Sequence, residues 1–113
     1  EKKYRSKGIN KNLSYYLNFD ENKFNEFFNN SPIKRIGWNR FLRNIIIATG
    51  NSKNRNLIKY LEEHLENQCS IIRGTCIWAL FQLINNKQKK EIKHKILKYE
   101  KNSYVLYELN MTR

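Results

Sequence analysis

The sequence predicts an all-α protein, built as a short α-solenoid of two-helix repeats with an N-terminal helical cap. Apolar residues recur with helical spacing along nearly the whole chain, and no window alternates with the period of two that strands show. Two segments also correspond to each other thirty residues apart. The chain has 113 residues, 40% of them hydrophobic, which is enough for one small hydrophobic core. We therefore expect a single compact domain overall.

Residues 1–30 are expected to form a helical lead-in that caps one end of the solenoid. Asp20 is a good N-cap for the second of two short helices, because its carboxylate accepts from free backbone N–H groups. The apolar positions that define these helices are Leu13, Tyr16 and Leu17 in the first, and Phe24, Phe27 and Phe28 in the second.

Residues 31–113 are expected to form the repeat module. Ser31 and Pro32 start a single turn, because serine caps a helix and proline fits its first position, and Gly37 ends that turn. Helices are expected at about 38–49, 55–66, 70–83 and 89–100, followed by a final turn or two from Ser103. The expected boundaries between these helices are a helix end at Gly50, Asn51 and Ser52, and an N-cap at Ser70. A further break between helices is expected at Asn85 and Asn86.

An internal repeat joins these helices into pairs. Arg43 falls on Arg73 thirty residues later, and Leu61 and Leu65 fall on Ile92 and Ile96 thirty-one residues later. Each unit, 38–66 and 70–100, pairs two amphipathic helices, and a third unit begins near Ser103. Two-helix units at this period predict HEAT-like repeats, in which each unit buries its apolar face on its neighbours.

The positive charge is unevenly distributed. The formal net charge is +12, and the abundance of Lys, Asn and Ile together is typical of an AT-rich genome. That bias does not explain the acid-free stretch between Glu26 and Glu62, which carries Lys34, Arg35, Arg40, Arg43, Lys53, Arg55 and Lys59. A field of one sign attracts polyanions, so a nucleic-acid partner is favoured.

The cysteines and histidines do not indicate a metal site or a disulfide framework. Cys69 and Cys76 are the only two cysteines, and Cys76 lies in an apolar helix where an inert buried thiol is the expected role. His64 and His94 are isolated on charged helices, and we expect both at the surface.

No segment of the sequence predicts a membrane anchor. The apolar run at residues 45–48 is far too short to span a membrane, and the first residues, EKKYRSKG, lack the apolar core of a signal peptide. We expect a cytoplasmic location. The sequence begins at Glu1, which agrees equally with a domain of a longer chain, a naturally short protein or the remnant of a longer gene.

Two motifs carry a resemblance to a known family. The stretch SPIKRIGWNRFLRNIIIATGNS, followed about twenty residues later by SIIRGTCIWAL, resembles the C-terminal region of epoxyqueuosine reductases. The resemblance covers roughly 13–80 and fades in the lysine-rich tail, and Trp38 stands where the family more often has a polar residue. The matching residues are Ser31, Pro32, Ile33, Lys34, Arg35, Gly37, Phe41, Arg43, Asn44, Ala48, Gly50, Asn51 and Ser52, then Ile72, Arg73, Gly74, Trp78, Ala79 and Leu80.

This resemblance implies a role in tRNA modification. The family reduces epoxyqueuosine to queuosine at the wobble position of tRNA, using a cobalamin and two [4Fe–4S] clusters that need eight cysteines. The present chain has two cysteines, which match none of those positions, so we expect no cofactor and no catalytic residue in it. What remains resembles the helical module that helps to hold the anticodon stem-loop, as a monomeric unit of a larger parent chain.

Five residues are predicted to contact tRNA. Lys34, Arg35 and Arg40 precede the stretch that corresponds between the two units, which starts at Phe41, and are expected to face the ligand, whereas Arg43 and Arg73 agree equally with a structural role inside the repeat. Trp38 could stack on a base, although a tryptophan beside Phe41 and Leu42 more often belongs to a core.

Two other classes of protein stay open. A HEAT-like alkylpurine DNA glycosylase would need a carboxylate in its basic groove, whereas the acids Glu62, Glu63 and Glu66 lie outside the basic stretches. A non-catalytic protein-interaction solenoid would show no salt-dependent binding of RNA.

Overall fold

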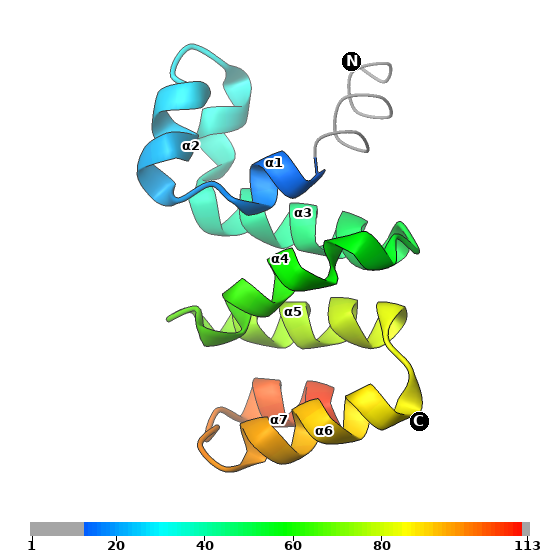
Figure 1. Cartoon of the computed structure of the whole chain (residues 1–113). Helices are drawn as coiled ribbons and strands as arrows, with labels where there is room; N and C mark the ends of the chain where they lie inside the picture. Colours follow the sequence, from blue (N-terminus) through cyan, green and yellow to red (C-terminus); the bar gives the residue numbers. More distant parts are fainter. Residues whose placement is uncertain (1–12, 112–113) are drawn as a thin grey trace.

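A computed structural model describes residues 13–111, and these residues form helices joined by short turns (Figure 1). No strand occurs in this range, which confirms the all-α prediction. The α-helices are α1 (Leu13–Leu17), α2 (Glu21–Phe27), α3 (Trp38–Asn51), α4 (Ile58–Glu62), α5 (Ser70–Leu83), α6 (Asn86–Leu97) and α7 (Ser103–Asn110). The described range also holds three 3-10 helices: η2 (Pro32–Ile36), η3 (Arg55–Leu57) and η4 (Glu63–Glu66).

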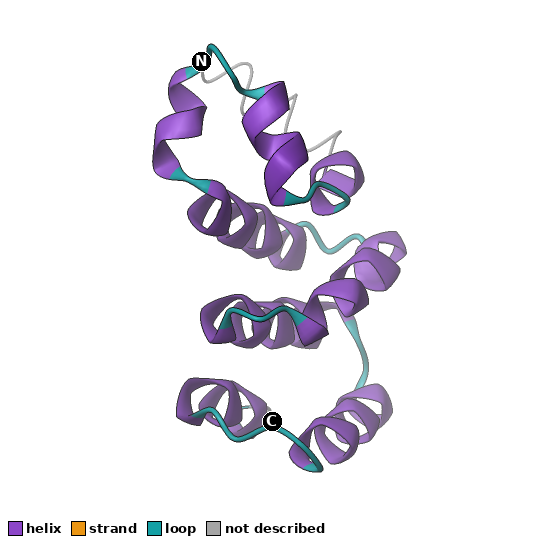
Figure 2. Cartoon of the chain, turned by 90° about the vertical axis from the view of Figure 1, so that its left-hand side faces the viewer, coloured by secondary structure: helices purple, strands orange, loops and turns teal. Residues whose placement is uncertain are grey.

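The helices form two layers in an elongated stack of 42 × 26 × 18 Å (Figures 1 and 2). Helices α3, α5 and α7 follow one another in one layer, with α3 packed on α5 and α5 packed on α7. Helix α1 packs on α3 and α4, and α4 packs on α5, so α1 and α4 belong to the other layer, which α6 continues. Each long helix thus buries its apolar face against the preceding and following ones.

Two glycines allow the long helices to approach closely. A Cβ atom on Gly50 would lie 2.9 Å from the Cα of Ala79, and one on Gly74 would lie 2.3 Å from the ring of Tyr104. Gly50 lies in the last turn of α3 beside Ala79 in the C-terminal half of α5, and Gly74 lies near the start of α5 beside the start of α7. The three helices therefore run parallel.

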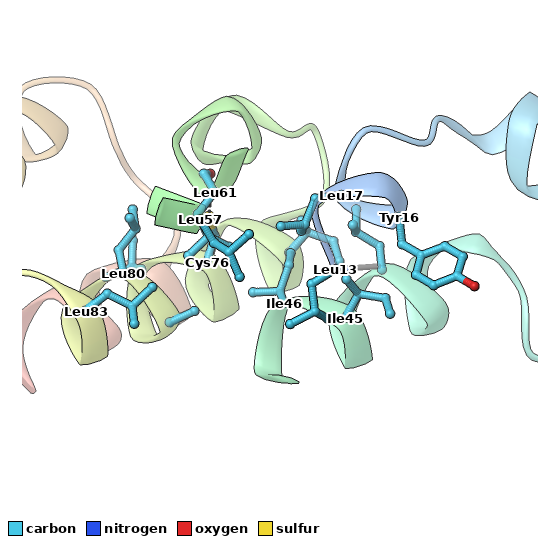
Figure 3. Close-up of a cluster of buried hydrophobic side chains, with 14 of the residues drawn as sticks. Leu13, Tyr16, Leu17, Ile45, Ile46, Leu57, Leu61, Cys76, Leu80 and Leu83 are labelled. Carbon is cyan, nitrogen blue, oxygen red and sulfur yellow. Dashed lines mark hydrogen bonds between the residues drawn. The ribbon is translucent and has the colours of Figure 1, made fainter. Parts of the chain in front are cut away.

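One hydrophobic core runs through the stack. Figure 3 shows its central part, where buried side chains of α1 and α3 lie beside those of η3, α4 and α5. At the N-terminal end the core becomes aromatic: the Phe24 ring lies 5.1 Å from that of Phe41, and Phe28 lies 5.2 Å from Phe41. Thr49 and Thr75, the buried polar residues of the described range, donate to helix carbonyls one turn earlier.

Several predicted helix boundaries are confirmed. The Asp20 carboxylate accepts from the Lys23 N–H at 2.8 Å, and the Ser31 hydroxyl accepts from the Ile33 N–H at 3.2 Å. Gly37 ends the turn after Pro32 with φ of 85°, a left-handed conformation that glycine adopts without strain.

Other boundaries are shifted, and neighbouring residues explain why. Helix α3 continues through Gly50 and Asn51 instead of stopping there, because the missing Cβ serves the contact with α5. Cys69, not Ser70, precedes α5, without a side-chain cap. Asn85 starts α6 through a reciprocal capping box with Gln88 rather than breaking the chain, and α6 ends at Leu97.

Four further predictions need correction. The segment expected as one helix, 55–66, is divided into η3, α4 and η4. Phe27 is 46% exposed, because α2 ends there and only Phe24 and Phe28 turn inward. His64 is half-buried, with Nε2 2.7 Å from the Leu17 carbonyl oxygen, and so links the lead-in to η4. The cap of α7 is Asn102, whose side chain accepts from two N–H groups, rather than Ser103.

No helix among residues 13–111 is long and apolar enough to cross a membrane.

Candidate nucleic-acid interface

Four of the five predicted tRNA contacts form an exposed basic cluster at the start of α3. Lys34 and Arg35 lie on η2, and Arg40 and Arg43 lie on the first turns of α3. All four side chains are exposed, and none is paired with a carboxylate in the described part of the chain. We call these four residues the basic cluster.

Local chemistry fixes the position of the basic cluster. The turn of η2 is held by the Ser31 cap and ends at Gly37, whose N–H donates to the Lys34 carbonyl at 3.2 Å. The chain reverses at Gly37 and enters α3 directly. Arg40 and Arg43, three residues apart, share the side of α3 away from its buried residues.

The amino-terminal ends of the three parallel helices lie along one edge of the stack, on the side that Figure 2 turns toward the viewer. Trp38 at the start of α3 and Cys69 before α5 line a common hollow, and Arg73 on α5 reaches Glu100 before α7. Neither α3 nor α5 has a side-chain N-cap. Free N–H groups and the helix dipole therefore add positive potential to the edge that carries the basic cluster.

Arg73, the fifth predicted contact, is engaged within the chain. Its Nε and Nη2 donate to the two carboxylate oxygens of Glu100, both at 2.9 Å. Its Nη1 donates to the backbone carbonyls of Asn67 at 2.8 Å and Gln68 at 3.2 Å. The side chains are 19% and 5% exposed, so the ion pair is largely shielded from water. These contacts support the structural role that the sequence left open for Arg73.

The ion pair with Arg73 lowers the pKa of Glu100. The hydrogen bonds from Arg73 hold the pKa of Glu100 below its ordinary value, and the N–H of Asn102 acts in the same direction. Glu100 thereby joins the start of α7 to the loop before α5. Sequence analysis missed this partner, because it lies 27 residues from Arg73 and no local pattern connects the two.

Two hollows flank the loop formed by Asn67 and Gln68. The first, of about 510 Å³, lies between the starts of α2, α3 and α5. The second, of about 440 Å³, lies beside the Arg73–Glu100 pair and contains Tyr99. The residues that line the first hollow are Glu21, Trp38, Asn39, Asn67, Gln68 and Cys69.

Trp38 serves both the core and this hollow. Its ring lies 5.9 Å from that of Phe24 and 6.4 Å from that of Phe41, and it is half-buried. The prediction that it packs on the core is confirmed, while its remaining surface lines the hollow.

The cysteines differ sharply in environment. The Cys76 thiol is buried and lies 2.8 Å from the Leu61 carbonyl oxygen, to which it donates. Burial raises the pKa of Cys76, and the nearby Glu62 charge raises it further, so the thiolate nucleophile is suppressed. Cys69 is half-buried, and residues 13–111 contain no group of three possible metal ligands.

Comparison with known proteins identified a relative that the chain matches over part of the relative's length. The chain is 37% identical to an epoxyqueuosine reductase of Francisella cf. novicida (strain Fx1) over 86 residues, which cover 72% of this chain and 22% of that protein. The chain thus spans about a fifth of the relative, and the match supports a related region. No protein-family profile and no solved structure matches the chain.

Proposed function

We propose that this chain is the C-terminal, tRNA-binding helical module of an epoxyqueuosine reductase. The observation that carries the proposal is the partial match to such a reductase, together with the two motifs that hold the basic cluster and Arg73. The parent enzyme would reduce epoxyqueuosine to queuosine at the tRNA wobble position in the cytoplasm, with this module binding the anticodon stem-loop.

The geometry of the basic cluster suits an RNA backbone. In the described structure none of its four cations is paired with a carboxylate, and Lys34 Nζ donates only to the Asn29 side-chain oxygen at 3.3 Å, so binding a phosphate breaks no existing ion pair. Each phosphate contact releases condensed counterions, which makes the affinity dependent on salt. The helix starts on the same edge add N–H donors, which bind phosphate oxygens without selecting a sequence.

Arg73 takes a different part in this proposal. Its charge is shared with Glu100, so it contributes less to the electrostatic attraction than the basic cluster does. Instead it holds the loop of Asn67 and Gln68 in place beside the cluster.

The two layers are consistent with HEAT-like repeats, formed by α3 with α4 and by α5 with α6, and α7 would begin a third unit. In this arrangement α1 and α2 cover the first unit as a cap.

The residues of this chain do not fit the cofactors of the family. An iron–sulfur cluster takes four thiolate ligands, whereas the chain has two cysteines, and one of them is buried beneath the Leu61 carbonyl. The clusters and the cobalamin would therefore belong to another part of the parent enzyme.

The test is a salt titration of binding to an anticodon stem-loop. The triple variant Lys34→Ala, Arg35→Ala, Arg40→Ala should lower the slope of log K against log salt by about 2 to 3, because each lost phosphate contact removes about 0.7 to 0.9. The matched control is Lys87→Ala, Lys90→Ala, Lys95→Ala on α6, which removes the same charge from exposed positions away from the cluster.

The control should lower the slope much less, and both variants should keep the helical circular-dichroism spectrum of the parent chain. Equal effects of the two variants would show that net charge, not the basic cluster, governs binding. An absence of salt-dependent binding in the parent chain would favour a protein-interaction solenoid.

A further inference from the structure

The hollow at the starts of α2, α3 and α5 has the chemistry of a nucleobase site. It measures about 510 Å³, within the range of small-molecule sites in proteins. An aromatic ring, three amide side chains and a carboxylate line it, and these are the groups with which proteins hold unstacked bases of single-stranded RNA. A site for phosphate alone would have no use for the carboxylate, which repels anions.

The aromatic wall is fixed before any ligand binds. Trp38 rests on Phe24 and Phe41, so its ring is held by the core and loses little freedom on stacking. Its indole N–H has no hydrogen-bond partner in the described range and is not sealed from water. It therefore remains available to a ligand.

The polar wall is likewise held in place. The Asn67 side-chain oxygen accepts from the Cys69 N–H at 2.8 Å, which leaves its amide N–H groups unused. The Arg73 guanidinium holds the carbonyls of Asn67 and Gln68, and thus fixes the loop. The side chains of Asn39 and Gln68 make no hydrogen bond within residues 13–111 and supply both donors and acceptors.

Glu21 favours one base over the others. Its carboxylate lies on the first turn of α2, is exposed and has no cationic partner in the described structure. Guanine presents two adjacent donors, N1–H and N2–H, to a carboxylate. Adenine, cytosine and uracil each present one donor next to an acceptor, which the carboxylate repels. The amides in the same hollow suit the O6 and N7 acceptors of guanine.

We infer that this hollow binds an unpaired guanine of the RNA whose phosphates contact the basic cluster. The inference rests on the proposed function for the RNA, and adds a base-reading site to a backbone-binding surface. Asn39 of the hollow and Arg40 of the cluster are adjacent in the first turn of α3, so the base site and the backbone-binding surface are neighbours at this end of the helix.

The experiment measures fluorescence anisotropy of labelled seven-nucleotide RNAs bound to the full chain. The probes are oligouridylates whose central position is guanine, adenine, cytosine, uracil or an abasic sugar. The guanine probe should bind at least tenfold more tightly than the abasic probe. Trp38→Leu should lower the affinity for the guanine probe about tenfold, as loss of one stacked base does, and leave the affinity for the abasic probe unchanged.

Glu21→Gln separates base reading from simple electrostatics. It should remove the preference for guanine over adenine by weakening the binding of the guanine probe, while the binding of the other probes strengthens slightly, since one negative charge is lost. Glu26→Gln, an exposed change of equal charge on α2 outside the hollow, should keep the preference. Both glutamates are exposed, so neither change endangers folding.

Equal affinities for all probes, the abasic one included, would overturn the base site and leave the backbone-binding role standing. A guanine preference that survives both Trp38→Leu and Glu21→Gln would place base reading elsewhere and would also overturn it. If no probe binds while the anticodon stem-loop does, the inference fails and the proposed function stands; if the stem-loop does not bind either, both fall together.

Discussion

Glu100→Gln tests whether the Arg73–Glu100 ion pair holds the two ends of the C-terminal helices together. The substitution keeps the size of the side chain but leaves the guanidinium without its counter-charge. The two side chains are only 19% and 5% exposed, so water restores little of the lost interaction. Breaking a fully buried pair costs about 3 to 5 kcal/mol, and the partial exposure of Arg73 lowers our expectation to about 2 to 3 kcal/mol.

Urea unfolding followed by circular dichroism measures this loss. The control is Glu91→Gln on α6, an exposed acid without an ion pair in the described structure, which should change the free energy of unfolding by less than about 0.5 kcal/mol. If Glu100→Gln lowers the free energy of unfolding no more than the control does, the ion pair does not stabilise the fold as its geometry indicates.

Acidification should remove the difference between Glu100→Gln and the parent chain. Because the pKa of Glu100 is lowered on folding, its contribution is complete above the unfolded pKa of about 4.3 and disappears as the pH falls through the folded pKa. The gap in unfolding free energy should therefore be constant at pH 6 to 7 and shrink below about pH 4. A gap that does not change with pH would contradict this linkage.

Three further changes test the packing, the thiols and the caps. Gly50→Val places a side chain where a Cβ would lie 2.9 Å from the backbone of α5, and should lower the free energy of unfolding by about 1 to 3 kcal/mol in urea; an unchanged midpoint would refute the close contact. Ellman's reagent should label Cys69 in the native chain and Cys76 only after denaturation, so equal native rates would contradict the burial of Cys76. Asn85→Ala should cost about 1 kcal/mol through the lost cap, whereas Asn86→Ala, inside the helix, should cost less; equal losses would argue against the capping box.

Local signals predicted much of the fold. Apolar spacing located the long helices, and Asp20 and Ser31 announced helix starts because a capping side chain bonds to backbone two or three residues away. The capping box of Asn85 and Gln88 is equally local, and the pattern Asn-x-x-Gln could have revealed it. Reading two consecutive asparagines as a break concealed that signal.

Features that depend on contacts between distant parts of the chain could not be predicted from the sequence. The sequence predicts a helix stop at Gly50, which is the commonest role of glycine near a helix end. In the structure, the missing Cβ of Gly50 instead allows the backbone of α5 to pack closely against α3. The partner of Arg73 became identifiable only when the stack brought Glu100 beside it. The hollow combines residues from α2, α3 and the loop before α5, so no single stretch of sequence describes it.

The basic cluster could be predicted because its members are close in sequence. Lys34, Arg35, Arg40 and Arg43 lie within ten positions, and a turn followed by one helix keeps them together. Their freedom from carboxylates is a structural finding, since an acid from a distant helix could have neutralised them. Their contact with tRNA stays a prediction.

Chemical-shift mapping of the ¹⁵N-labelled chain against an anticodon stem-loop tests the proposed function most directly, because it reports every backbone amide in one titration. We expect the largest shifts at the basic cluster, along 34–43, and at the neighbouring loop of Asn67 and Gln68. If the largest shifts lie on α6 instead, or if no shifts are seen at low salt, the proposal that this edge of the stack binds tRNA is contradicted.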